Sequence, residues 1–469
     1  METQTASDKK KSQLSFGLRY SYGLGEFGFS FFLVFISYYL MYFLTDVAKF
    51  PTGTAAVIYT LVQWFECLTL LWAGFMMDRL HLKHGKYRPW VLIGGLGCAL
   101  GMVCFFTKWP IPMSVYTFVF PICYLVAYAG FNLMWVAYRS LMARIGKNQQ
   151  DTVALTTSAG QLGTVAMLVF SAVGTTLLYS FSNIETGYAV SALIYGVLIV
   201  VCCLIVFRMA KPYDGSNLRE ADTPTYQRIS LKNTLKSISG QMIPFFIAFV
   251  FRSVVQQIIP ALMVYHFTYA LHDPSGVQYY MLVYMAAQLL ALLVIRPVTN
   301  FFGKKRAFLI SSLSTTVLLV VAYFFSRNMW VFLAILGVNA FVTTFSASML
   351  PAFITDIADY NEYMLGSKDR SFTMSVGAMV LTVASLVGSA AVAFGLTAIG
   401  YSGTLTVVPD EMVLKITQFM LFGGAACALL SVAPMFFYKL NEHTMDQVYA
   451  RRDELAAAAE QGETAKAEA

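Results

Sequence analysis

Three charged side chains stand inside long apolar segments of this sequence, where a charge costs a few kcal/mol and therefore suggests a function. They are Glu26, Glu66 and Arg252. A carboxyl group at such a depth is suited to carrying a proton or binding a cation. Glu66 stands near the middle of its segment, which favours coupling to a cation, although a structural hydrogen-bonded carboxyl fits the same position. Glu26 could assist it, or could pair with a basic residue near the end of its own segment.

A stripe of aromatic and amide side chains follows a later apolar segment. Tyr124, Tyr128, Asn132 and Trp135 are separated by four, four and three residues, which places them on one face of a helix. Rings and an amide on one face suit stacking on a sugar ring and bonding its hydroxyl groups, and they equally suit packing between helices.

Arg252 is followed one helical turn later by Gln256. A guanidinium group can grip an anionic cargo through two parallel hydrogen bonds, or it can pair with Glu66 or Glu26. Because Arg252 lies deep within its segment, we do not expect it to reach the lipid headgroups. Its presence raises the hypothesis of a cargo with a carboxylate or sulfate group.

The segments that carry these residues are long enough to cross a membrane. The chain has 469 residues, 58% hydrophobic and 12% charged, with a mean hydropathy of +0.63. A soluble domain carries roughly 25% charged residues, and about 20 apolar residues span a bilayer as a helix. Since backbone groups in lipid must be paired within the segment, we predict an all-α membrane protein. The twelve expected spans are 22–45, 54–77, 90–107, 112–138, 153–180, 186–208, 240–268, 277–301, 305–325, 329–357, 371–398 and 413–438.

The cations are distributed unevenly between the two sides of these spans. Lys49, Lys108, Arg327 and Lys415 lie in one set of loops, Arg252 lies within a predicted span, and the rest of the 32 Lys and Arg residues lie in the other loops and the tails. Positive charge stays on the cytoplasmic side, so both termini are predicted to be cytoplasmic in a bacterial plasma membrane. The net charge of +7 then needs no nucleic-acid partner.

The longest loop divides the chain into two halves of six spans. The expected organisation is a cytoplasmic tail 1–21, a bundle 22–208, a cytoplasmic central loop 209–239, a second bundle 240–438 and a cytoplasmic tail 439–469. Gly85-Lys86-Tyr87-Arg88 in the first half is echoed by Gly303-Lys304-Lys305-Arg306 in the second. A duplicated six-helix unit predicts such an echo. Charged residues at these ends are candidates for gate contacts, namely Asp78, Arg79, Lys86, Arg88, Asp356, Asp359 and Glu362.

Three short motifs resemble the glycoside–pentoside–hexuronide:cation symporter family of the major facilitator superfamily, the group of melibiose permease. They are Tyr22-Gly-Leu-Gly-Glu26-Phe-Gly28, Gly85-Lys86-Tyr87-Arg88-Pro89-Trp90 and Asp359-Tyr-Asn-Glu362-Tyr363. The resemblance runs from about Leu18 to Tyr438, nearly the whole chain. It implies a major-facilitator fold and uptake of sugars or glycosides driven by H⁺, Na⁺ or Li⁺.

The resemblance also assigns positions, and some of these are altered. Glu66 stands at the first acid of a paired cation site, whereas Leu70 stands at the second. Ser30 stands where some members bind sugar with Asp or Asn, and Asn132 where the fourth helix has Asp or Asn. Because Na⁺ needs several oxygen ligands, a lone glutamate favours proton coupling, or no coupling, over Na⁺.

We therefore predict an alternating-access symporter of a sugar, glycoside or related small molecule, anionic cargo included, that is not an enzyme, needs no cofactor and acts as a monomer. Glu66 would carry the coupling proton, with Glu26 assisting. The alternatives are an uncoupled facilitator or exporter of a non-sugar or lipid-like cargo on the same fold and, more remotely, a membrane-embedded transferase. The predicted cargo site is lined by Ser30, Tyr128, Asn132, Trp135, Arg252 and Gln256.

Overall fold

The computed structural model describes residues 14–80, 82, 84–146, 149–214, 240–363, 370–402, 408–440, 444–448, 450–451 and 454. Within these residues, 12 helical segments are long and apolar enough to cross a membrane. The predicted all-α fold with twelve spans is therefore confirmed. Most of the central loop and the outer parts of both predicted tails lie outside the described residues.

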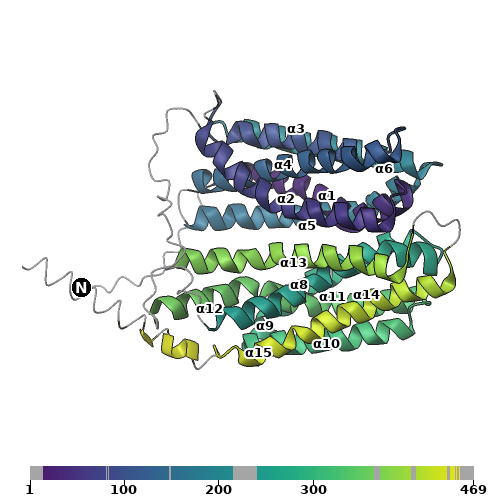
Figure 1. Cartoon of the computed structure of the whole chain (residues 1–469). Helices are drawn as coiled ribbons and strands as arrows, with labels where there is room; N and C mark the ends of the chain where they lie inside the picture. Colours follow the sequence, from purple (N-terminus) through teal and green to yellow (C-terminus); the bar gives the residue numbers. More distant parts are fainter. Residues whose placement is uncertain are drawn as a thin grey trace, which may run out of the picture. The chain divides into compact units, whose positions relative to one another are not determined.

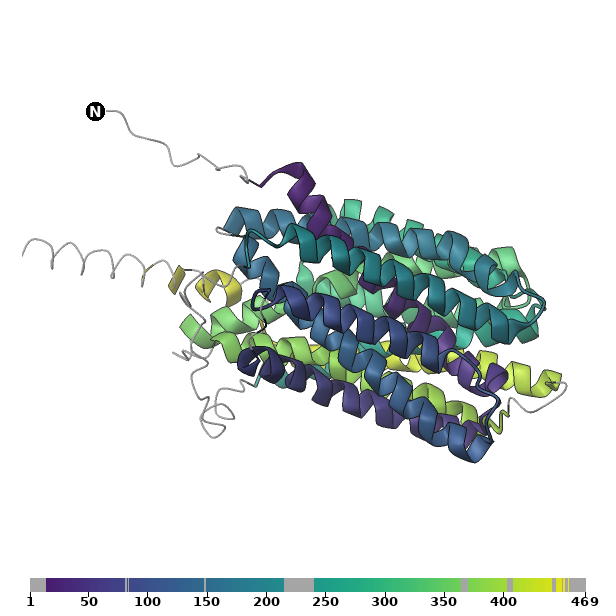
Figure 2. The same cartoon turned by 90° about the horizontal axis from the view of Figure 1, so that it is seen from above.

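The chain divides into two compact units, the first comprising Met1–Thr223 with Tyr401–Thr406 and the second Pro224–Gly400 with Val407–Ala469. In the first unit, α1 packs against α5 and α6, α3 packs against α4 and α6, and α2 packs against α4 (Figure 1). In the view from above, the long helices of this unit, coloured blue to teal, run roughly side by side along their length (Figure 2). Its helices are α1 (Phe16–Tyr42), the π-helix η1 (Phe43–Val47), α2 (Thr52–Arg79), α3 (Arg88–Phe105), α4 (Met113–Ile145), α5 (Gln149–Tyr179) and α6 (Ile184–Met209).

The second unit repeats this packing with its own helices. Here α8 packs against α13 and α14, α10 packs against α11 and α14, and α9 packs against α11. Its first helix also runs into a five-residue π-helix, as α1 does. The helices are α8 (Met242–Tyr265), η2 (His266–Ala270), α9 (Gly276–Phe302), α10 (Lys304–Phe324), α11 (Met329–Ser348), α12 (Leu350–Tyr363), α13 (Arg370–Ile399), α14 (Asp410–Leu430) and α15 (Val432–Phe437).

Three spans are among those that differ from their predicted limits. The tenth consists of two helices, α11 and α12, because Pro351 has no backbone N–H and interrupts the helical hydrogen-bond ladder. The first helix begins at Phe16, six residues before the predicted start of its span at 22. The fourth continues to Ile145 instead of stopping at 138, because no Gly or Pro interrupts it before Gly146. This last difference changes the candidate site.

Candidate functional site

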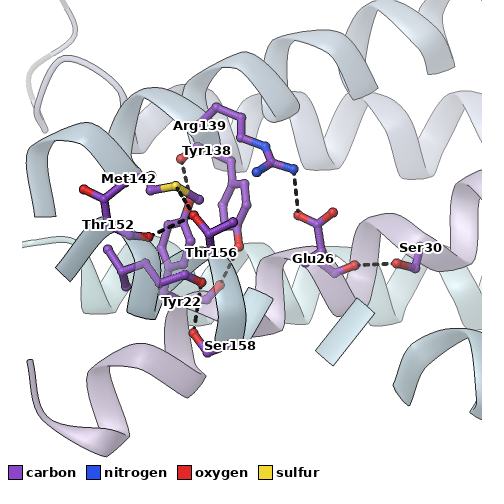
Figure 3. A network of polar contacts seen from close by, with 10 residues as sticks. Tyr22, Glu26, Ser30, Tyr138, Arg139, Met142, Thr152, Thr156 and Ser158 are labelled. Carbon is purple, nitrogen blue, oxygen red and sulfur yellow. Dashed lines mark hydrogen bonds and ion pairs between the residues drawn. The ribbon is translucent and has the colours of Figure 1, made fainter. Parts of the chain in front are cut away.

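An ion pair inside the first unit joins Glu26 of α1 to Arg139 of α4. Arg139 Nη2 lies 3.5 Å from Glu26 Oε2, and the two side chains are 40% and 19% exposed (Figure 3). Arg139 lies within a candidate membrane span, Met113–Met142, because α4 continues past the predicted end at 138. The prediction that Arg252 is the only cation within a span is therefore wrong. Of the two roles left open for Glu26, pairing with a basic residue is the one for which the structure supplies a partner.

Tyr22 of α1 and Tyr138 of α4, which lie next to the ion pair, hold the two helices in this register. Tyr22 Oη donates to the Tyr138 carbonyl oxygen at 2.9 Å, and Tyr138 Oη donates to the Tyr22 carbonyl oxygen at 3.1 Å (Figure 3). Their rings stack with centroids 4.2 Å apart. Gly25 makes this approach possible, since a Cβ there would lie 2.5 Å from the Tyr138 ring. Glu26 follows one turn after Tyr22, and Arg139 directly follows Tyr138, so this pairing of tyrosines brings the two charges together.

Replacing Tyr138 by Phe should lower the free energy of unfolding by about 1 kcal/mol, because one net hydrogen bond is lost while the stacked ring remains. Unfolding in mixed detergent micelles would measure the change. Tyr20→Phe is the matched control, since the Tyr20 hydroxyl donates to Gln161 in an exposed position, at 3.0 Å. A Tyr138→Phe variant as stable as Tyr20→Phe would mean that the bond donated by the Tyr138 hydroxyl contributes nothing to stability.

The guanidinium of Arg139 packs against the ring of Trp135, which belongs to a cluster of aromatic side chains. Its Cζ lies 4.3 Å from the ring centroid of Trp135, one turn earlier on α4, which is cation–π distance. Trp135 in turn contacts Phe29 and Phe131, with ring centroids 5.8 Å and 5.9 Å away. Trp135, predicted as a cargo contact, is thus half-buried between the ion pair and an aromatic cluster.

Ser30 lies one turn beyond Glu26 on α1, and its side chain hydrogen-bonds the backbone of α1 itself. Its hydroxyl donates to the Glu26 carbonyl oxygen at 2.8 Å, and the side chain is buried. Gly163 of α5 lies against both residues, since a Cβ on it would stand 3.1 Å from Glu26 Cγ and 3.4 Å from Ser30 Oγ. The face between α1 and α5 is therefore narrow beside Glu26.

Glu66, the predicted coupling residue, lies half-buried on α2 opposite α4. Among the described residues, its carboxylate has no ion-pair partner. Tyr59, Tyr124 and Tyr128 are its electrostatic neighbours. This cluster places part of the predicted α4 stripe beside the carboxyl group.

Asn132, predicted as a cargo contact, uses its amide between helices. Its Nδ2 donates to the Glu66 carbonyl oxygen at 3.1 Å and to Thr69 Oγ1 at 2.8 Å. Tyr128 is buried as well and packs against Tyr124 with ring centroids 4.8 Å apart. The α4 stripe therefore serves packing against α2, one of its two expected roles, over Tyr124 to Asn132.

In the second unit Arg252 is buried, with 2% of its surface exposed. Its Nε donates to Ser346 Oγ at 2.8 Å, and its Nη2 donates to the Thr343 carbonyl oxygen at 3.5 Å. Its Nη1 is buried without a hydrogen-bond partner, and no carboxylate of the described second unit pairs with it. Gln256, one turn on, is half-buried.

Asp214, just after α6, organises the end of the first unit near Gly85. Its buried carboxylate accepts backbone hydrogen bonds from Lys86, Tyr87 and Arg88 at 3.2, 2.8 and 2.7 Å. It also pairs with Arg144 Nη1 at 2.7 Å. The sequence analysis did not identify Asp214. It named Lys86 and Arg88 as candidate gate residues because of their charged side chains, whereas their bonds to Asp214 come from the backbone N–H groups.

Gly85 adopts φ +118°, a conformation that L side chains rarely occupy. A Cβ on it would also collide with the Asp214 backbone oxygen at 2.2 Å. Glycine is therefore required at this turn. The predicted gate residues Asp78 and Arg79 lie at the end of α2, where their side chains fall outside the described residues.

The corresponding turn of the second unit has Gly303 at φ +75°. Lys304 Nζ there bonds both carboxylate oxygens of Asp356 on α12, at 2.8 and 2.7 Å. Asp359 is buried and Glu362 is half-buried farther along the same helix. The echoed glycine turns thus carry an acidic contact in each unit, built from different residues.

Twelve candidate spans in two similarly packed units of six spans each are the architecture of transporters of the major facilitator class. The solved structure of a D-xylose–proton symporter shares this fold, with a TM-score of 0.64 and 12% identity over 92% of this chain and 98% of that one. The chain belongs to the MFS/sugar transport protein family, which it matches over residues 21–442. The resemblance found in the sequence is therefore confirmed.

Curated relatives are similar over nearly their whole length. The isoprimeverose transporter of Lactiplantibacillus pentosus is 26% identical over 94% of this chain and 92% of its own. An Escherichia coli (strain K12) protein whose name assigns it provisionally to sulfoquinovose import is 24% identical over 93% of this chain and 94% of its own. The chain is accordingly a multi-pass membrane transporter and not an enzyme, as predicted.

Proposed function

We propose that this protein is a proton-coupled symporter that moves a sugar, glycoside or related small molecule, including one with an anionic group, by alternating access. The observation that carries the proposal is the pair of carboxyl groups within spans of the first unit. Glu26 faces a partly exposed arginine, and Glu66 has no ion-pair partner among the described residues. Carboxyl groups at membrane depth are the usual proton carriers of transporters.

The rest of the predicted organisation belongs to this proposal. The two bundles would alternate around a cargo site lined by Ser30, Tyr128, Asn132, Trp135, Arg252 and Gln256. Lys86, Arg88, Asp78, Arg79, Asp356, Asp359 and Glu362 would form gate contacts at the cytoplasmic end. The monomer would lie in a bacterial plasma membrane with both termini in the cytoplasm.

Buried side chains at several of these positions support a site that opens only in another conformation. Asn132, Ser30 and Arg252 are each no more than 5% exposed. A relative named as an isoprimeverose transporter and another named for sulfoquinovose import support a sugar-like cargo, neutral or anionic.

Uptake into proteoliposomes tests the coupling. With radiolabelled isoprimeverose and D-glucuronate, an inward proton gradient of one pH unit should drive about tenfold accumulation of a cargo that enters with one proton. A protonophore should abolish accumulation, whereas replacing Na⁺ by K⁺ should leave it unchanged. Uptake that equilibrates regardless of both gradients would contradict symport and indicate a facilitator.

A further inference from the structure

Arg139 is held less firmly than the other arginine ion pair of its unit. Its nearest atom is 3.5 Å from Glu26, whereas Arg144 lies 2.7 Å from Asp214. A charge-assisted hydrogen bond between a guanidinium and a carboxylate is about 2.7–2.9 Å long. Glu26 Oε2 is also buried without a hydrogen-bond partner. The Glu26–Arg139 contact is therefore an ion pair without a hydrogen bond, and no described residue hydrogen-bonds the fork of Arg139.

Arg139 is also far more exposed than Arg252, the other arginine considered as an anion ligand. Its side chain is 40% exposed, whereas Arg252 as a whole is 2% exposed. The ring centroid of Trp135 lies 4.3 Å from the guanidinium Cζ, and a ring packed on one face still permits a ligand to bind in plane at the edge. A carboxylate or sulfonate presents two oxygens in a plane, which matches this edge.

We propose that Arg139 binds the anionic group of the cargo, a carboxylate or a sulfonate, in exchange for Glu26, and that the released Glu26 takes up a proton, which is the assisting role predicted for it. The inference rests on the proposed function and names the cargo class and the exchange at the same site. Before binding, Glu26⁻ and Arg139⁺ sum to zero charge. Afterwards a neutral Glu26, Arg139⁺ and the bound anion again sum to zero, so Glu26 takes up one proton for each monoanion bound.

The surroundings of Glu26 require this proton. A carboxylate left charged and unpaired in a membrane interior costs several kcal/mol. The charged or titratable groups that face Glu26 among the described residues are Tyr22 on its own helix and Tyr138 and Arg139 on α4. Helix α5 presents Gly163 to it, and α6 approaches α1 through Cys202 at Gly28.

Neither Tyr22 nor Tyr138 can stabilise the charged carboxylate of Glu26 in place of a proton. Both hydroxyl groups already donate to backbone carbonyl oxygens. Arg139 is thus the only cation that faces Glu26 in the described part of the unit, and a cargo anion that engages it leaves Glu26 without a counter-charge. The proton comes from water on the side to which the site is open.

Calorimetric binding to the purified full-length protein tests this exchange. The probes are D-glucuronate and 6-deoxy-6-sulfo-D-glucose, with D-glucose as the neutral reference, in buffers of different ionisation enthalpy. We expect binding of an anionic probe to take up about one proton, so that its affinity falls by up to about tenfold per unit rise in pH. Failure of both anionic probes to bind, or binding without proton uptake, overturns the inference.

Three variants separate the roles of the two side chains. Arg139→Gln should weaken the anionic probes at least tenfold relative to D-glucose, and Arg139→Lys should retain part of that preference. Glu26→Gln should bind the anions at least as tightly as the unaltered protein, without proton uptake and without dependence on pH. Lys108→Gln, which removes a cation paired with Glu185 at a loop, should change nothing.

Two outcomes contradict Arg139 specifically. One is an Arg139→Gln protein that binds the anions normally, and the other is loss of anion preference in Arg252→Gln alone. Failure of the inference remains distinct from failure of the proposed function. Gradient-driven uptake of isoprimeverose that survives in Arg139→Gln would leave symport standing, whereas equilibrium binding reports on Arg139 even if no probe is accumulated.

Discussion

Glu66→Gln is expected to abolish uphill accumulation of cargo while preserving exchange. The amide keeps the shape of the side chain beside Tyr59, Tyr124 and Tyr128 but cannot take up a proton. Accumulation under a gradient of one pH unit should therefore fall from about tenfold to about onefold. Counterflow of labelled against unlabelled isoprimeverose needs no net proton movement and should continue.

The matched control for this variant is Glu185→Gln. Glu185 pairs with Lys108 and its side chain is 37% exposed, so it removes a carboxylate outside the candidate site. Both proteins would be reconstituted at equal density and compared in the same two assays. Normal accumulation by Glu66→Gln would exclude Glu66 as the coupling residue and direct the search to Glu26.

Asp214→Asn is expected to destabilise the first unit severely. The substitution removes the negative charge that pairs with Arg144, and it replaces one oxygen that accepts backbone bonds by a group that donates. Breaking one partner of a buried ion pair costs about 3–5 kcal/mol. We expect a fall in melting temperature of roughly 5 °C or more and a poor yield of folded protein.

Thermal unfolding in detergent, followed by size-exclusion fluorescence, measures this loss. Arg144→Gln should lose less stability than Asp214→Asn, because the three backbone N–H groups still have Asp214 as their acceptor. Lys415→Gln alters an exposed pair and serves as the control. An Asp214→Asn protein as stable as the control would show that this carboxylate does not hold α3, α4 and α6 together.

The spans could be predicted from the sequence because apolar length is a local property of the chain. Arg139 could not, since a cation at the edge of an apolar run is ordinarily read as the start of a loop. The carboxylate that pairs with Arg139 comes from another helix, Glu26 of α1, whereas the ring of Trp135 contacts Arg139 locally from one turn earlier on α4. Only the absence of Gly or Pro between 138 and 146 hinted that the helix continues.

The residue types of the candidate site could be predicted from the sequence, but the partners that these residues contact could not. Asn132 carries the amide that suits a sugar, yet that amide bonds α2. Asp214 was invisible because its backbone partners lie 126 to 128 positions away along the chain. Periodicity reports which residues share a face, whereas the identity of the facing partner depends on how distant helices meet.

The repeated packing of the two units bears on how such a protein can change over time. The same helix pairings recur in both, while the charged side chains differ, with Glu26, Glu66 and Arg139 in one unit and Arg252 in the other. After an ancestral gene duplication, shape could persist in both copies as polar residues drifted independently. New cargo preferences could then evolve through a few substitutions, without redesign of the scaffold.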